Sequence, residues 1–191
     1  MTLKTDGELL RDTSDDVSAF ADLVRRHQAV LVRYATRRLG PADAEDIVNE
    51  TFAIAYARRD RYDATRPDAR PWLFGIATNL IRRHARTEAR TLRAYAKTGV
   101  DPVAPAVASR GIDTAVAGTL AALRPKYRDV LFLHAVAEFS HEEIAEAMDI
   151  PVGTARGWLS RARVEAAKEL ESRGVTRQTP PMEPEPTVAK P

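Results

Sequence analysis

The stretch from residue 43 to residue 93 constrains the fold most, because its apolar residues recur at helical spacing while its charges are sorted by segment. Positions 43–50 hold four acidic residues and no basic one, whereas positions 82–97 hold six basic residues and one acidic residue. After the adjacent pair Arg82 and Arg83, the arginines follow one another at spacings of three and four, which places them on one helix face. The pattern predicts amphipathic helices with an anionic surface and a cationic surface in one small domain.

The same helical period continues through most of the chain and predicts an all-α fold. Gly40-Pro41 ends a first helix, and two prolines mark a loop at 60–71. Ser140 and Glu143 form a capping box that starts a short helix. The predicted helices span residues 17–39, 41 to the loop, 71 onward, 115–123, 125–136, 140–150 and 152–171.

Weakly patterned segments divide this all-α chain into two small helical domains joined by a flexible linker. Fully extended, the fifteen-residue linker reaches about 50 Å, more than the ~35 Å between successive turns of DNA. The predicted divisions are an N-terminal extension (1–16), a first domain (17–96), the linker (97–111), a second domain (112–171) and a disordered Pro-rich tail (172–191).

Several classes of function find no support in the residues. The chain has no cysteine, hence no disulfide and no thiolate ligand. His141-Glu142 opens a zinc-helix pattern, but Ala145 stands where the second histidine is needed. Since there is also no Gly-rich phosphate loop, we expect no metal, no cofactor and no enzymatic activity. The lack of a ~20-residue apolar run and a polar N-terminus lead us to expect a cytoplasmic protein.

Residues 140–164 have the proportions of a helix-turn-helix. At 100° per residue, Ala155, Leu159 and Ala162 fall on one side of the second helix, and small, hydroxyl-bearing and cationic residues fall on the other. Such a face can approach a DNA major groove closely. The alternative to DNA binding is that this basic face is only a solvated surface. The same alternative applies to the acidic face and the arginine-rich face of the first domain.

These segments, in this order, resemble a bacterial sigma factor of the extracytoplasmic-function type, within the sigma-70 family. Three stretches carry the resemblance: DAEDIVNETF (43–52), RPWLFGIATNL (70–80), and the segment from Leu123 to Arg163 with its PVGT at 151–154. The resemblance implies a region 2 helical bundle and a region 4 helix-turn-helix. It implies binding to both large subunits of core RNA polymerase, to promoter DNA, and to an anti-sigma factor.

By position, the resemblance also assigns roles to individual residues. Core polymerase would be bound by Asp43, Asp46, Ile47, Asn49, Glu50 and Phe52. The minus-ten strand would be held by Arg61, Tyr62, Asp63, Trp72, Asn79, Arg82, Arg83 and Arg86, with aromatic rings stacking on bases. The minus-thirty-five duplex would be bound by Thr154, Arg156, Ser160, Arg161 and Arg163. The chain departs from the usual pattern at Asn49, where the shorter amide should be tolerated, and at Arg83, Gly157 and Trp158, and these later changes bear on the preferred promoter sequence.

Two other readings compete with this one. A helix-turn-helix regulator could bind duplex DNA without polymerase, and it would need no acidic docking helix. A helical enzyme could use Asp46 and Glu50 for acid/base work, although no nucleophile or metal-ligand spacing accompanies them.

Overall fold

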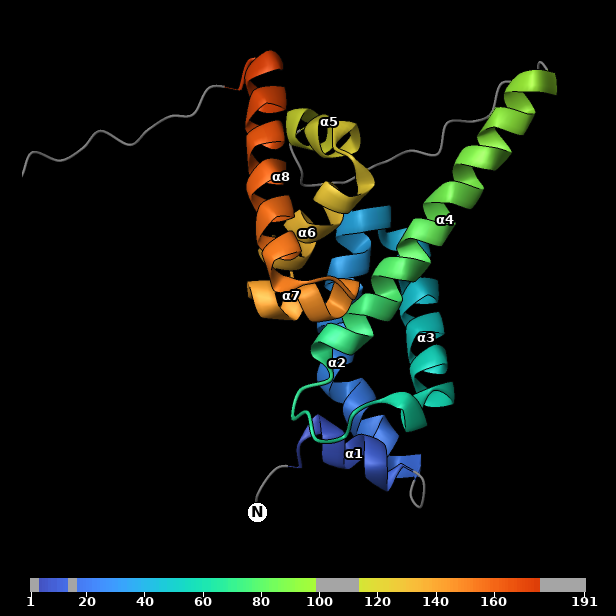
Figure 1. Cartoon of the computed structure of the whole chain (residues 1–191). Helices are drawn as coiled ribbons and strands as arrows, with labels where there is room; N and C mark the ends of the chain where they lie inside the picture. The colour runs from blue at the N-terminus through green and yellow to red at the C-terminus, as the bar shows by residue number, and fades with distance from the viewer. Residues whose placement is uncertain (1–3, 14–16, 99–113, 176–191) are drawn as a thin grey trace, which may run out of the picture.

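The structure is a computed structural model that describes residues 4–13, 17–98 and 114–175, with side chains described up to residue 90 and again from residue 115. Within these ranges all regular structure is helical, which confirms the all-α prediction (Figure 1). The helices are α1 (Asp6–Asp12), α2 (Val17–Leu39), α3 (Pro41–Ala57), the short 3-10 helix η1 (Arg59–Arg61), α4 (Arg70–Thr98), α5 (Thr114–Ala122), α6 (Pro125–Ala135), α7 (His141–Met148) and α8 (Val152–Ser172).

The first domain is a bundle in which α2, α3 and α4 pack on one another. Gly40 has a φ of 91°, a conformation that favours glycine, and Pro41 begins α3 at a position where its missing N–H is not needed. The apolar faces then meet: the Phe20 ring packs edge-on against those of Phe52 and Tyr56, with centroids 6.4 and 5.1 Å away. This packing fixes the rotation of α3 and therefore which of its residues face outward.

Helix α1 was not anticipated, since residues 1–16 were predicted only as an extension. Thr5 and Glu8 form a capping box that starts it, and Leu9 and Leu10 are buried in the bundle. A Cβ on Gly7 would lie 2.5 Å from the carbonyl oxygen of Ala64, so glycine permits α1 to press against the loop before α4. The predicted capping residues 14–16 lie outside the described residues.

Helix α4 is the longest element, at 29 residues, and its C-terminal half extends beyond the bundle (Figure 1). Its first turn is stabilised by the Asp68 carboxylate, which accepts a hydrogen bond from the Arg70 amide at 2.8 Å. The helix continues to Thr98, one residue past the predicted start of the linker. The rest of that linker and the predicted tail beyond residue 175 lie outside the described residues.

The second domain contains the predicted helix-turn-helix. The capping box of Ser140 and Glu143 starts α7, and Asp149 ends it in the left-handed conformation at φ 51°. Ala155, Leu159 and Ala162 are buried, as their spacing predicts. A single apolar core runs through both domains, because α6 and α7 pack against α4. The sequence predicts only a linker between the domains, so their direct contact is an addition to that prediction.

Candidate nucleic-acid interface

The acidic face of α3 is partly exposed and partly turned toward α4. Asp46 and Asn49 are exposed. Asp43 and Glu50 are half-buried and lie near α4, with carboxylate oxygens 3.7 Å from His84 Nε2 and 3.6 Å from an Arg83 nitrogen. These are long contacts at partly exposed groups, so each contributes little to stability.

Ile47 and Phe52 do not belong to this surface. They are only 5% and 7% exposed, and both lie in the core of the first domain. Their side chains therefore hold α3 in place and do not form a docking surface in this conformation. A sequence motif does not by itself separate buried residues from exposed ones.

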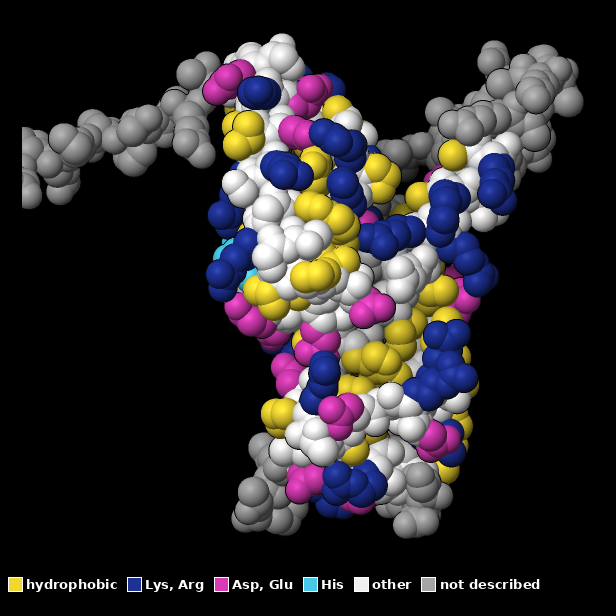
Figure 2. Space-filling model, viewed as in Figure 1, with side chains coloured by type: hydrophobic (Ala, Val, Ile, Leu, Met, Phe, Trp, Pro, Cys, Tyr) yellow, Lys and Arg dark blue, Asp and Glu magenta, His cyan; other side chains and the backbone are white. Residues whose placement is uncertain are grey.

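The cationic face of α4 is exposed at Asn79, Arg83 and Arg86. Arg82 differs: its side chain is 31% exposed, and its Nε donates to Asp129 of α6 at 2.6 Å. The side chains beyond residue 90, including the predicted Arg93 and Lys97 of the stripe, lie outside the described residues. Figure 2 shows basic side chains on the visible face over both α4 and α8.

The loop between η1 and α4 is organised around Tyr62, which is 9% exposed. Its hydroxyl lies 3.2 and 3.0 Å from the carbonyl oxygens of Arg66 and Asp68, and its ring packs on Trp72 with centroids 5.1 Å apart. Burial, with smaller contributions from nearby carboxylates, raises the pKa of Tyr62. Arg61 and Asp63 are exposed, and hydrogen bonds from Thr65 lower the pKa of Asp63. Tyr62 thus supports the loop, while half-buried Trp72 retains an accessible surface.

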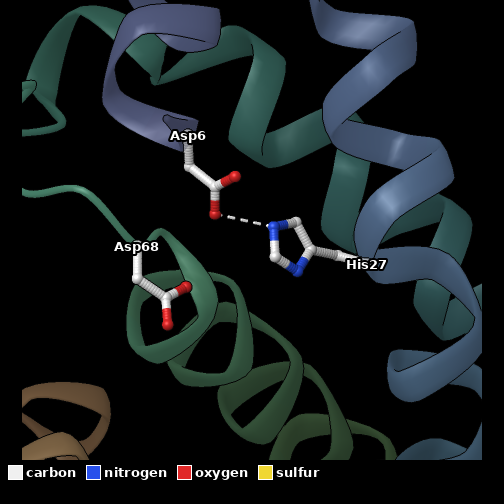
Figure 3. Close-up of side chains that lie close together, drawn as sticks. All are labelled: Asp6, His27 and Asp68. Carbon is white, nitrogen blue, oxygen red and sulfur yellow. Dashed lines mark hydrogen bonds and ion pairs between the residues drawn. The ribbon is translucent and has the colours of Figure 1, made fainter. Parts of the chain in front are cut away.

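Asp6, His27 and Asp68 lie close together where α1, α2 and the start of α4 meet (Figure 3). Their potential ligand atoms are within 4.8 Å of one another, as in a cation site. Yet both Asp6 oxygens already accept protein donors: one from Arg26, the other from His27 Nε2 at 2.7 Å and the Ala69 amide at 2.9 Å. We therefore interpret the cluster as a structural one that holds α1 against α2 and the start of α4.

A pocket of about 480 Å³ lies beside this cluster. Its walls come from the first domain, including Arg33, Pro67 and Arg70, and from Ala137 and Glu138 of the second domain. The loop that precedes α4 therefore forms part of a boundary between domains, a placement that its sequence does not indicate.

The outer face of α8 presents the predicted duplex-binding residues. Arg156, Ser160, Arg161 and Arg163 are exposed, and Thr154 is half-buried. Two of the arginines have partners: Arg156 contacts Glu142 at 3.2 Å, and an Arg163 nitrogen lies 2.8 Å from His134 Nε2.

His134 also has its Nδ1 3.1 Å from the Phe139 carbonyl oxygen. The carbonyl oxygen can only accept, so Nδ1 is placed to donate to it, and Nε2 faces the Arg163 guanidinium. These two pairings were not predicted from the sequence, because Glu142 and His134 belong to helices other than α8.

Asp129 was also missed. It lies on α6 next to apolar Val130, is 0% exposed, and contacts Arg38 as well as Arg82. A single acid within an otherwise apolar helix face is a weak signal, and its two partners are 91 and 47 residues away along the chain.

Among the described residues, none of the helices combines the length and the apolar character that a membrane span requires.

Comparison with known proteins gives a consistent result. Residues 23–91 match the family of sigma-70 region 2, and residues 114–165 match that of sigma-70 region 4. The ECF RNA polymerase sigma factor SigW of Bacillus subtilis (strain 168) is 35% identical over 172 residues, covering 81% of this chain and 90% of the relative. The RNA polymerase sigma factor CnrH of Cupriavidus metallidurans is 31% identical over 174 residues, covering 83% and 90%.

Solved structures agree with these relatives. CnrH in complex with the cytosolic domain of CnrY matches with a TM-score of 0.63 and 28% identity, covering 87% of this chain and 97% of that one. The sigma factor RpoE in complex with the anti-sigma factor NepR, from Bartonella quintana, matches with a TM-score of 0.59 and 26% identity, covering 78% and 97%.

Proposed function

Since this chain belongs to the extracytoplasmic-function sigma factors of the sigma-70 family, we propose that its three charged surfaces divide the work of promoter recognition. As a sigma factor it binds core RNA polymerase and promoter DNA and directs transcription initiation. The observation that carries the division is geometric: acidic α3 and cationic α4 expose adjacent faces of one bundle, and α8 exposes a second cationic face on the other domain.

The exposed part of α3 is the docking surface for core polymerase in this proposal. Asp46 and Asn49 make the contact, and Asp43 and Glu50 become available if their contacts with His84 and Arg83 loosen. Ile47 and Phe52 contribute by holding the helix. Because the interaction is between charged surfaces, it should depend on salt.

The minus-ten strand binds along α4 and the loop before it. Asn79, Arg83 and Arg86 are available to phosphates and base edges, and Trp72 offers a ring on which an extruded base stacks. Arg61 and Asp63 are exposed in the same loop, whereas Tyr62 is buried and supports the loop by donating a hydrogen bond to the Asp68 carbonyl oxygen. Holding the separated strand in this way favours the melted promoter.

The minus-thirty-five duplex binds the outer face of α8. Arg156, Arg161 and Arg163 supply cationic contacts, and Thr154 and Ser160 supply hydroxyl groups. From Asp113 to Glu171 the chain has seven basic and ten acidic residues. The attraction to DNA must therefore come from this local face and not from the overall charge of the domain.

A partner that sequesters the protein also belongs to the proposal. RpoE, one of the similar structures, is in complex with an anti-sigma factor, and we propose that this chain has one too. We further propose that the protein acts in the cytoplasm, with polymerase, and that it works by binding and not by catalysis. A duplex-binding regulator without polymerase is not favoured, because both sigma regions match along the chain.

The decisive experiment mixes the protein with core RNA polymerase and fragmented genomic DNA from its source, and sequences the 5′ ends of the transcripts. We expect discrete new start sites that share two upstream elements. Asp46→Arg should reduce them, whereas Asp22→Arg makes the same charge change on exposed α2 and should not. A lack of association with core polymerase, after any inhibitor is removed, would contradict the proposal.

A further inference from the structure

Helix α6 packs against α8 and supplies partners to residues on two opposite edges of that helix (Figure 1). Lys126 holds its Nζ 4.8 Å from the centroid of the Trp158 ring, and His134 faces Arg163. Trp158 and Arg163 are five residues apart, which places them about 140° from each other around the helix. Lys126 and His134 are eight residues apart, or about 12 Å at 1.5 Å per residue, close to the full width of a helix. Helix α6 therefore crosses α8 on its buried side and reaches both edges of its outer face.

Lys126 carries a charge that no carboxylate neutralises. Its Nζ also lies 5.3 Å from the centroid of the Tyr127 ring, and Tyr127 is only 2% exposed. With the described residues Lys126 makes these two ring contacts and no ion pair. Arg124 at the start of the same helix differs, because it donates to Glu165 at 2.7 Å. The ammonium group of Lys126 therefore keeps N–H donors for a partner outside the chain.

Trp158 borders the residues proposed to bind the minus-thirty-five duplex. It follows Thr154 by four residues and precedes Arg161 by three, spacings that make side chains neighbours on a helix surface. The indole is half-buried and packs on the core, which fixes the ring that Lys126 contacts. An added Cβ on Gly157 would meet nothing within 4 Å, so the surface beside the ring is open. The charge of Lys126 is thus held at one edge of the DNA-binding face.

An aromatic ring and a carboxylate hold a cation with different consequences for DNA binding. A carboxylate cancels the charge, as Glu142 does in part for Arg156, whereas a ring attracts an ammonium group and leaves its charge in place. This difference matters in a domain with seven basic and ten acidic residues from Asp113 to Glu171. Trp158 is also a position at which the chain departs from the usual family pattern, so the ring that holds Lys126 is a feature of this chain.

We propose that Lys126 is a further duplex-binding residue, held on the Trp158 ring so that its ammonium group contacts a DNA phosphate beside Thr154 and Arg161. Trp158 is the positioning residue for this contact. A phosphate contact strengthens binding and fixes the orientation of the protein on the duplex, but it does not select a base sequence. The inference rests on the proposed duplex-binding role of α8, and an Arg161 variant in the test keeps the two apart.

The test uses the full chain and a labelled 30-base-pair duplex of mixed sequence, because the proposed contact does not depend on sequence. Fluorescence anisotropy titrations at several salt concentrations give the affinity and its salt dependence. Lys126→Gln should weaken binding at least about threefold at low salt and reduce the slope of log affinity against log salt by about 0.9, the value for one phosphate contact on a duplex. Lys126→Arg keeps the charge and the attraction to the ring, and should bind within about twofold of wild type.

Variants of Trp158 test whether the ring positions Lys126. Trp158→Leu keeps an apolar side chain against the core but removes the ring, and should weaken binding about twofold or more, whereas Trp158→Phe keeps a ring and should retain most of the binding. Adding Lys126→Gln to Trp158→Leu should weaken binding less than Lys126→Gln does in wild type, because the two changes affect one contact. The control is Arg37→Gln, which removes one positive charge from an exposed site on α2 and should leave the slope unchanged.

An unchanged slope in Lys126→Gln would overturn the proposal, and so would an equal reduction in Arg37→Gln, since the effect would then come from net charge. Full additivity of Trp158→Leu and Lys126→Gln would remove the positioning role of the ring. Arg161→Gln tests the function on which the inference rests. If Arg161→Gln weakens duplex binding and Lys126→Gln does not, the inference alone fails; if neither does, the duplex-binding role of α8 fails with it. Circular dichroism checks folding, and if Trp158→Leu does not fold, the comparison of Lys126→Gln with Lys126→Arg decides.

Discussion

Asp6 shows how one buried side chain can fasten an N-terminal segment. It is 2% exposed, and it joins α1 to α2 and to the start of α4 through His27 and the Ala69 amide. Burial by itself would raise the pKa of Asp6, but hydrogen bonds from His27, the Ala69 amide and Arg26, together with the charge of His27, lower it. The ionised form is thus the one that the fold stabilises.

We therefore expect Asp6→Asn to lower the free energy of unfolding by about 3 kcal/mol at pH 7, as when one partner of a buried ion pair is removed. Because the folded-state pKa is depressed, this stabilisation is fully present above the pKa of the unfolded chain, near 4, and is lost as the pH falls through the lower folded-state value. Urea unfolding at pH 7 and pH 3 measures both effects.

The control is Asp12→Asn, at an exposed pair with Lys4, which should lower the free energy of unfolding by less than about 1 kcal/mol. A difference between Asp6→Asn and wild type that does not shrink at pH 3 would contradict this.

Helix α7 depends on a capping box at its start, and the role proposed for helix α4 depends on the arginines along one of its faces. Helix α7 has only eight residues, so its capping box contributes a large share of its local stability. Helix α4 carries its exposed arginines at a spacing that only a continuous helix keeps on one side. In each case the function assigned to the element depends on its remaining helical.

Ser140→Ala should lower the free energy of unfolding by about 1 kcal/mol, because the amide of Glu143 loses its acceptor at 3.2 Å. Thermal unfolding followed by circular dichroism measures the loss. Ser160→Ala, an exposed serine within α8 with no capping role, should change stability by less than about 0.5 kcal/mol. Equal losses in the two variants would remove the capping explanation.

The cationic face of α4 makes a separate prediction for salt dependence. Changing Arg83 and Arg86 together to Gln should reduce the slope of log affinity against log salt by about 0.7 per lost phosphate contact on single-stranded DNA. Arg25 and Arg37 are exposed on α2 and provide a double Gln variant of equal charge. Anisotropy titrations at several salt concentrations measure the slopes. The same reduction in both double variants would show that binding is not localised to α4.

At the scale of the whole molecule, the two domains share one apolar core, and they should unfold together. Each domain has one tryptophan, Trp72 on α4 and Trp158 on α8. Variants that keep only one tryptophan, made with Trp72→Phe or Trp158→Phe, therefore report the domains separately.

We expect the two single-tryptophan proteins to show coincident urea transitions by fluorescence, the signature of cooperative unfolding. Introducing Gly75→Ala into both should separate the midpoints, because an added Cβ on α4 would lie 2.6 Å from the carbonyl oxygen of Ala147 on α7 and disrupt the shared core. Gly153→Ala, where an added Cβ meets nothing within 4 Å, should leave them coincident. Separate midpoints already in the absence of Gly75→Ala would show that the contact contributes little to stability.

The helices from α2 to α8, their order along the chain and the sorting of charge can be predicted from the amino-acid sequence, whereas α1 and η1 were not predicted. Helix starts and ends are set by residues that are adjacent in the chain, as at Gly40-Pro41 and in the capping box of Ser140 and Glu143. The apolar period is likewise a property of each segment. These features can therefore be predicted without knowing what a helix packs against. The family resemblance could be recognised for the same reason. The assignment of Ile47 and Phe52 shows the limit of such reasoning, since a period locates an apolar face but not the partner that covers it.

Contacts between residues far apart in the chain could be identified only from the folded arrangement of the helices. Asp129 meets Arg38 and Arg82 because α6 packs against the first domain, and no local pattern specifies that meeting. The same holds for Gly75 beside Ala147 and for the docking of α1 through Asp6. Packing of preformed helices brings distant charges into a desolvated contact, where their pairing becomes obligatory. That contact joins the apolar residues of the two domains in one core.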